Sequence, residues 1–508
     1  MITAVMNSGL RMLDLLVTTA HIVRDHGYMI YDVLVAQDHT FTPRPQMADW
    51  TISDDKKVYT FTLRDGLMFH DGNPVTVADA VASLKRWGKR DSGGRLIFDV
   101  TESFVVKDDK TIVWTLKKPY WPLLDTLSKM SAVPPFIMPA RIAATTLDQA
   151  ITDYIGSGPF KFVASEYKPG VSVTYEKFDV YVPRKEPADW MTGGKVLKVD
   201  KVKWVTMPDT QTAINALLAG EVDYVEQIPV DLLPILQASD NVVAEVRDPL
   251  GFQAIGRMNF LYPPFNDVKI RQAAMMALSQ QDILGALIGN PDYYKVCGAI
   301  FGCGTPLGDE TGAETLTHGG DIEAAKKILA ESDYDGTPVV LLQTTDLPII
   351  VVQPVVAAQA LRKAGFNVDM QPMDWQTLVT RCASQAKPSE GGWNLFFTNW
   401  SVPEIATPLI NPMLNGRGKE AWFGWPTDEK LENLRRDFIA AKTPEERKRV
   451  AHEIQVHALD VVNYIPLGQL LSPQGRSKKL INMIPARSGT SRRWIDRTAP
   501  GAGRPVAG

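Results

Sequence analysis

The stretch ADWTISDDKKVYTFTLRDGLMFHDGNPVTVADAVASL, residues 48–84, carries the local patterns that decide the fold of this chain. Within it, residues 58–63 (VYTFTL) alternate with a period of two, which predicts a β-strand. An Asp-Gly-Asn-Pro segment then breaks the chain. Thr76 and Asp79 form a capping-box pattern, which predicts the start of a helix over residues 77–86.

Outward from this stretch, short strands and helices alternate along the chain. Residues 339–343, 354–363 and 366–370 predict a strand, a helix and a second strand, and such β-α-β units build parallel or mixed sheets. The same alternation predicts strands over 112–116, 171–176 and 199–207, and helices over 209–220, 268–278 and 445–459. The predicted fold class is therefore α/β, with mixed sheets flanked by helices.

Length, charge and hydropathy indicate the number of lobes and exclude some kinds of partner. The chain has 508 residues, and since single hydrophobic cores stop growing at about 250–300 residues, we expect at least two lobes. The formal net charge of −4 gives no basic patch, so we expect no nucleic-acid partner. The most apolar run, residues 347–361, is interrupted by Pro and Gln and is too short to span a bilayer.

The first 20 residues do not resemble a signal peptide, because they lack a basic start and an uninterrupted apolar run. Two explanations stay open: an export signal was removed from the chain, or the protein stays in the cytoplasm.

The three cysteines are too few for a disulfide scaffold. Cys297 and Cys303 lie close together in CGAIFGC, where glycines let a short loop close, and no further metal ligands are nearby. This pattern favours a disulfide between them over two free thiols, and it leaves Cys382 unpaired.

No local pattern predicts catalysis. His452 and His457 are five residues apart, whereas a zinc helix needs two His at i and i+4 to share one face. Gly156-Ser157-Gly158 matches neither a phosphate loop nor a nucleophile elbow. We therefore expect a protein that is not an enzyme and needs no cofactor. A hydrolase on a two-lobed scaffold, and a sensor or chaperone, are the alternatives.

Four ordered motifs resemble the peptide/nickel class (family 5) of bacterial extracellular solute-binding proteins. They are residues 48–84, GSGPFKF at 156–162, AINALLAGEVD at 213–223 and PPFNDVKIRQAAMMA at 263–277. The motifs lie between residues 48 and 277, and the resemblance covers nearly the whole chain. The resemblance implies the two-lobed periplasmic-binding-protein clamp, with an extra subdomain in lobe one. It also implies a monomer outside the cytoplasm that captures a small molecule or short peptide and delivers it to the membrane permease subunits of an ABC importer.

The resemblance also implies domain limits. Lobe one would comprise residues 1–40, 160–252 and 468–508, its extra subdomain residues 41–159, and lobe two residues 253–467. The chain would cross between the lobes near residues 251–257 and 466–468, and hinge motion would close the lobes around the ligand.

Trp400 is the leading ligand-binding candidate. It ends the apolar run NLFFTNW, between Asn399 and Ser401, and matches the position where the family places a Trp at the cleft. Peptide binders of this class follow that Trp with an Asp for the peptide's ammonium group, and this chain has none. Only Glu404 is close enough to replace it, and we expect Glu404 to face solvent or cap a turn. A blocked peptide, an opine or a sugar is therefore favoured as the ligand over a dipeptide with a free amino group.

Further ligand-binding candidates come from several segments. Two roles are open for Arg257: it forms a bidentate clamp for a ligand carboxylate, or it forms an ion pair within its lobe. The remaining candidates are His21 in the segment that resembles the first-lobe cleft loop, Phe252 and Asn259 beside the first crossing, and Trp375 and Trp422 as cleft walls or core residues.

Overall fold

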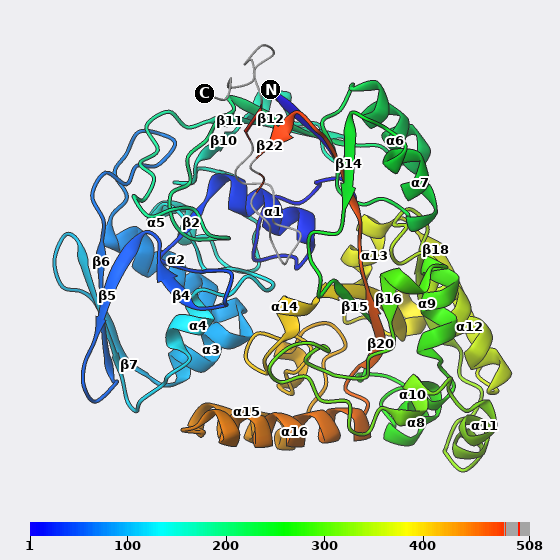
Figure 1. Ribbon diagram of the computed structural model, residues 1–508. Coiled ribbons are helices and arrows are strands. Elements are labelled where there is room, and N and C mark those ends of the chain that lie inside the picture. Colours follow the sequence, from blue (N-terminus) through cyan, green and yellow to red (C-terminus); the bar gives the residue numbers. More distant parts are fainter. Residues whose placement is uncertain (482, 484–495, 498–508) are drawn as a thin grey trace.

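Three β-sheets of four or more strands organise the computed structural model of the protein (Figure 1). The structure describes residues 1–481, 483 and 496–497. The mixed sheets and surrounding helices confirm the predicted α/β class. Among the described residues, no helix combines the length and hydropathy that a membrane span requires.

The first sheet has seven strands in the order β10-β11-β12-β1-β13-β21-β14. Strand β1 is parallel to both β12 and β13, so the carboxyl ends of these three strands lie at one edge. The strands are β1 (Ile2–Met6), β10 (Phe160–Phe162), β11 (Ser172–Lys177), β12 (Lys201–Thr206), β13 (Tyr224–Val225), β14 (Val242–Glu245) and β21 (Gln474–Ser477). Their helices are α1 (His21–Ile30), α6 (Thr210–Ala219) and α7 (Leu233–Gln237).

The second sheet has six strands in the order β16-β20-β15-β19-β17-β18. They are β15 (Phe252–Met258), β16 (Tyr294–Lys295), β17 (Val339–Thr344), β18 (Val368–Met373), β19 (Leu395–Ser401) and β20 (Ile465–Leu470). The helices of this part are α8 (Val268–Met276), α9 (Gln280–Ile288), α10 (Glu314–Thr317), α11 (Ile322–Ala330), α12 (Gln353–Lys363), α13 (Trp375–Cys382), α14 (Val402–Ile405), α15 (Glu429–Ala440) and α16 (Pro444–Asp460). Strands β17 and β18 are parallel neighbours in the sheet and are connected by α12, which confirms the predicted β-α-β unit.

The third sheet is antiparallel, in the order β5-β6-β8-β7. Its strands are β5 (Ala48–Ile52), β6 (Val58–Leu63), β7 (Thr101–Val106) and β8 (Thr111–Leu116), with helices α2 (Val77–Arg90), α3 (Ser92–Asp99), α4 (Leu123–Leu127) and α5 (Ala140–Ala143). Two-stranded pairings join β2 (Asp32–Val33) to β9 (Phe136–Ile137), β3 (Val35–Gln37) to β4 (Pro43–Pro45), and β22 (Leu480–Ile481) to β23 (Asp496–Arg497).

The local signals of the sequence set several element ends. Thr76 and Asp79 form the predicted capping box at the start of α2, where the Asp79 amide donates to the Thr76 hydroxyl. Asp209 caps α6, and Gly220 ends that helix in the left-handed region at φ 77°. A side chain at Gly220 would strain this backbone, so the glycine is what lets the chain turn sharply.

Sheet membership locates the two crossings between the first and second sheets. The chain leaves β14 at Glu245 and enters β15 at Phe252, and it leaves β20 at Leu470 and enters β21 at Gln474. Both connections lie a few residues from the positions expected from the sequence, because β15 and β20 pair with each other up to Phe252 and Leu470. Residues 482, 484–495 and 498–508 of the predicted lobe one lie outside the described residues.

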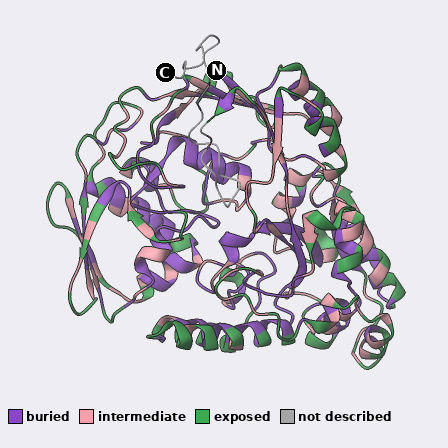
Figure 2. Ribbon diagram, in the orientation of Figure 1, coloured by how far each residue is buried: buried purple, intermediate pink, exposed green. Residues whose placement is uncertain are grey.

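The third sheet contacts both neighbours. One apolar core contains Trp87 and Trp114 of this part together with Trp400 and Leu414 from the second. The Trp121 indole also donates to the Ile439 carbonyl at 2.8 Å. Helix α1 is almost wholly buried between the parts of the chain that carry the three sheets (Figure 2). A clamp built this way encloses space next to α1.

Candidate functional site: a cleft between the sheets

A cavity opens where the start of α1 faces strands β15 and β19. It has about 710 Å³ of empty space, counting the solvent at its mouth. The side chains that line it come from the parts of the chain that carry the two large sheets. They are Asn7, Ser8, Thr19, Ala20, His21 and Gln227 from the part with the first sheet, and Phe252, Leu347, Ile349, Ile350, Trp375, Leu378, Val379, Cys382, Phe396, Thr398, Asn399, Trp400, Trp422 and Phe423 from the part with the second.

Aromatic rings form one wall of the cavity. His21 stacks on Phe252 with ring centroids 6.0 Å apart, and it meets Trp400 edge-on at 6.1 Å. Trp400 in turn lies edge-on to Trp422 at 5.6 Å. The buried Trp400 Nε1 donates to no acceptor among the described residues. An unpaired buried N–H is costly, so this donor is available to a ligand oxygen or to water.

Asn399 lines the cavity but is committed to the protein. Its Oδ1 accepts from the Gln353 amide at 2.8 Å, and its Nδ2 donates to the Ile349 carbonyl at 2.9 Å. These bonds fix the end of β19 against the start of α12. Asn399 therefore positions Trp400 and the apolar wall at Ile349.

Glu404 lies behind the aromatic wall and not in the cavity. Its side chain is 0% exposed, 2.5 Å from Arg24 Nη1 and 3.5 Å from His21 Nε2. The prediction that Glu404 faces solvent is therefore wrong. Burial would raise the pKa of Glu404, but the neighbouring Arg24 and His21 outweigh it and hold the pKa below its usual value. Its charge is matched inside the protein.

Arg257, Asn259 and Ser401 also lie outside the cavity lining. Arg257 is wholly buried and donates to the carbonyls of Phe423 and Asn463, at 2.5 and 2.7 Å. Burial lowers its pKa to about 9. Neither the carboxylate clamp nor the ion pair expected for Arg257 appears, because the strand turns this side chain toward backbone carbonyls.

The other two residues are placed by the same strands. Asn259 donates to the Trp393 carbonyl at 2.9 Å, which ties the end of β15 to the start of β19. Ser401 is the last residue of β19 and is fully buried. Of the ten candidates from the sequence, the structure thus brings His21, Phe252, Trp375, Asn399, Trp400 and Trp422 together around one cavity.

Five polar lining residues escaped the sequence reasoning: Thr19 and Thr398, and a group of three formed by Asn7, Ser8 and Gln227. Asn7 and Ser8 follow β1, and Gln227 follows β13, so all three lie at the carboxyl edge of the parallel strands. Ligands of α/β proteins bind at such edges. The sequence signal for Asn7 and Ser8 was a short apolar strand that ends in Asn-Ser. This signal indicates a ligand site only when the order of the strands in the sheet is known.

Several contacts hold the two sides of the cleft together. Trp422 Nε1 donates to Thr19 Oγ1 at 3.3 Å, and Arg11 pairs with Asp374 at 3.0 Å. With the Arg24–Glu404 pair, they join the start of the chain to the segments after β18 and β19. These three contacts bridge the two sides of the cleft.

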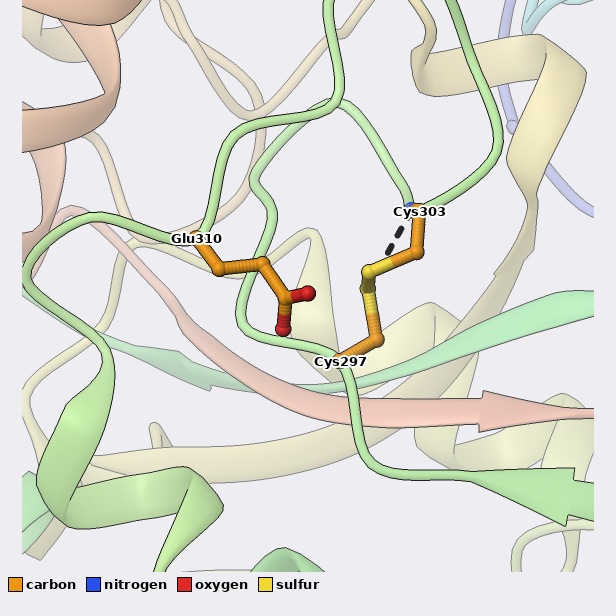
Figure 3. Close-up of side chains that lie close together, drawn as sticks. All are labelled: Cys297, Cys303 and Glu310. Atoms are coloured by element: carbon orange, nitrogen blue, oxygen red, sulfur yellow. Dashed lines mark hydrogen bonds between the residues drawn. A yellow bond between two sulfur atoms is a disulfide. The ribbon is translucent and has the colours of Figure 1, made fainter.

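Cys297, Cys303, His452 and His457 do not line this cavity. Cys297 and Cys303 are joined by a disulfide, and the Glu310 carboxylate lies beside it (Figure 3). These three side chains are the group of possible metal ligands among the described residues, and both sulfurs are already bonded. His452 and His457 do not converge: they pair separately with Asp309 and Asp428.

Two large sheets, two connections between them and an aromatic cleft where they meet define a solute-binding protein of the clamp type. The family of bacterial extracellular solute-binding proteins, family 5 (middle part) matches residues 42–418, and the chain belongs to this family. Its membership places the chain among transport components and not among enzymes.

A curated relative supports this family membership. The "Probable peptide ABC transporter periplasmic-binding protein y4tO" of Sinorhizobium fredii is 40% identical over 94% of this chain and 90% of its own length. The "Dipeptide-binding protein DppE" of Bacillus subtilis is 27% identical over 68% of this chain and 64% of its own.

Among solved structures, AgaA from A. tumefacien R10 in complex with agropinic acid has a TM-score of 0.82 at 22% identity, covering 98% of this chain and 99% of its own. The oligopeptide-binding protein AppA from Bacillus subtilis, with a nonapeptide, has a TM-score of 0.79 at 17% identity with the same coverage. These two structures show that the fold is the same.

Proposed function

We propose that this protein is the extracytoplasmic solute-binding subunit of an ABC importer and captures a peptide-like solute between its two lobes. The observation that carries the proposal is the cavity at Trp400, whose aromatic wall and uncharged polar groups come from the parts of the chain that carry the two large sheets. Apolar walls with a few fixed polar groups are typical of small-ligand sites. The 40% identical relative, described as a probable peptide transporter component, supports peptides as the solute class.

The two lobes would be those of the sequence prediction, hinged at the connections 246–251 and 471–473. In the periplasm a monomer would close on its ligand, and the closed form would dock on the permease subunits. Closure is favoured only by contacts that the ligand makes better in the closed state. The contacts at Thr19, Arg11 and Arg24 would break on opening.

An opine is a second candidate solute. The lining of the cavity contains no Asp or Glu, and the nearby Glu404 is paired with Arg24. A free ammonium group would find no counter-charge at Trp400, which favours a solute without one. The similar fold of AgaA, solved with agropinic acid, agrees with this alternative.

A thermal-shift screen tests the proposal. Peptides of two to five residues and opines are offered to the purified protein, and hits are titrated by calorimetry. A ligand at a hundredfold excess over its Kd stabilises the folded protein by about 2.7 kcal/mol. Small-angle scattering should then show compaction with bound ligand. If no peptide or opine binds, the proposed function is wrong.

A further inference from the structure

A second hollow adjoins the ligand cavity. It shares Thr19, Trp422 and Phe423 with that cavity and has about 820 Å³ of empty space, counting solvent. Its other side is formed by the part of the chain that carries the four-stranded sheet, around the end of α2. The two hollows are therefore neighbours that meet at the Thr19–Trp422 contact, and a solute longer than the Trp400 cavity would displace this contact to extend into the second hollow.

Ionised side chains line the second hollow, whereas none of the Asp, Glu, Lys or Arg residues lines the first. Three of its charges are neutralised in two ion pairs. Lys129 pairs with Asp91, and both side chains are buried. Glu420 pairs with Arg95 at 2.6 Å. These two pairs leave no carboxylate free in the lining.

The cations Arg90 and Lys419 remain without a carboxylate. Both line the hollow, both are exposed, and neither forms an ion pair with any described residue. Arg90 donates from Nε to the Leu16 carbonyl at 3.1 Å, which holds the side chain in place. Its two terminal nitrogens have no protein acceptor among the described residues, so its guanidinium presents an open fork.

The surroundings of Arg90 disfavour its own charge. Partial burial and the neighbouring Arg95 both lower the pKa of Arg90. An anion bound at the fork would offset both effects and accept two parallel hydrogen bonds, the geometry that Arg and carboxylates prefer. On the opposite side of the ligand cavity the cation Arg11 is already paired with Asp374.

We propose that Arg90 and Lys419 form an anion subsite of the cleft and bind a carboxylate at one end of the transported solute. The proposal rests on the function proposed above and adds the charge and orientation of the solute: its uncharged part lies at Trp400 and its carboxylate end in the second hollow. A carboxylate is common to the C-terminus of a peptide and to an opine acid, so the test includes both.

The test compares acids with their neutral forms by calorimetry. The probes are tri- to pentapeptides as free acids and as C-terminal amides, and agropinic acid with its methyl ester. Loss of a hydrogen-bonded charge is expected to weaken binding about ten- to a hundredfold. Arg90→Gln and Lys419→Gln should each reduce acid binding toward that of the neutral form. Lys85→Gln is the control, because Lys85 is an exposed cation on the same helix α2 and lines neither hollow.

The outcomes separate this inference from the proposed function. Preference for the acid that is lost in Arg90→Gln and kept in Lys85→Gln supports the anion subsite, and the class of the tightest probe identifies the source of the carboxylate. Equal binding of acid and neutral forms, or a preference that survives in both Arg90→Gln and Lys419→Gln, overturns the subsite while the binding function stands. Failure of every probe to bind rejects the proposed function and this inference with it.

Discussion

The Glu404 carboxylate lies 2.5 Å from Arg24 Nη1, and the two side chains are 0% and 3% exposed. Arg24 belongs to α1 and Glu404 to α14, which follows directly on β19. The pair is thus a buried ionic link between the two sides of the cleft. It also uses up the acidic group closest in sequence to Trp400, which leaves the cavity lining without a carboxylate.

Breaking this pair should cost stability. Glu404→Gln leaves Arg24 as an uncompensated buried cation, so we expect the free energy of unfolding to fall by about 3–5 kcal/mol in urea titrations. Glu453→Gln is the matched control, since it breaks the exposed Arg449–Glu453 pair, worth under about 1 kcal/mol. Replacing both partners, as Arg24→Met with Glu404→Leu, should recover much of the loss. Equal, small losses in Glu404→Gln and the control would contradict the interpretation.

The same pair makes a prediction about ligand charge. Because Glu404 is neutralised by Arg24, a free α-ammonium group gains nothing at Trp400. We expect N-acetylation of a bound peptide to leave its affinity unchanged or to strengthen it, whereas a lost charge pair would cost about 2–5 kcal/mol. Calorimetry on acetylated and free peptides decides. A loss of a hundredfold on acetylation would mean that another carboxylate binds the ammonium group.

The cysteine pair can be checked chemically. Alkylation of the unfolded protein without reductant should modify Cys382 alone, and alkylation after reduction should modify all three thiols. Cys297→Ser with Cys303→Ser should lower the free energy of unfolding by about 2–3 kcal/mol, as expected for a short closed loop in the chain-entropy model. Labelled thiols at Cys297 and Cys303 in non-reduced protein would disprove the bridge.

His26 should make stability depend on pH. It is wholly buried on α1, with Nδ1 2.9 Å from the Tyr175 hydroxyl, and burial lowers its pKa to about 3. An unfolded His titrates near pH 6.5, so between about pH 6.5 and 3 only the unfolded chain binds this proton. Stability due to His26 is therefore complete above about pH 6.5 and is lost as the pH falls.

Urea titrations between about pH 7.5 and 4.5 measure this slope. His26→Gln should make the decrease shallower by up to about 1.4 kcal/mol per pH unit, since one titrating group is removed. The exposed His318→Gln variant should keep the wild-type slope. Identical slopes in wild type and His26→Gln would show that His26 is protonated in the folded protein.

Much of the architecture was predictable because its signals are local. The capping residues Thr76 and Asp209, and the alternation in β6, depend on neighbours a few positions away. Trp400 was predicted at the cleft from the resemblance of its segment to the family, whereas Phe252 and Trp375 were candidates because of their places beside the first crossing and after the β-α-β unit. Short-range patterns and family motifs thus specify the elements and the general place of the site.

The partners of buried charges were not predictable. Arg24 was not among the candidates. Its partner Glu404 is distant from it in the sequence, so only the tertiary fold brings the two side chains together. Arg257 illustrates the same limit: the sequence left a ligand clamp or an ion pair open for it, whereas the side chain bonds the Phe423 and Asn463 carbonyls. Strand order, which no local pattern encodes, also decided that Gln227 reaches the cavity.

Trp400 offers the most direct test of the site. Trp400→Ala removes apolar wall from the cavity and should weaken every ligand, by about 2–4 kcal/mol if Trp400 is a binding hot spot. Trp400→Phe keeps an aromatic wall but lacks the Nε1 donor, which has no protein acceptor among the described residues. We expect it to lose about 0.5–1.5 kcal/mol if a ligand oxygen accepts that hydrogen bond. Trp50→Ala is the control, because Trp50 lies on the distant β5 and lines none of the cleft. Calorimetry with the tightest ligand of the screen gives the three Kd values. Wild-type affinity in Trp400→Ala would place the ligand elsewhere and remove the basis of the proposed site.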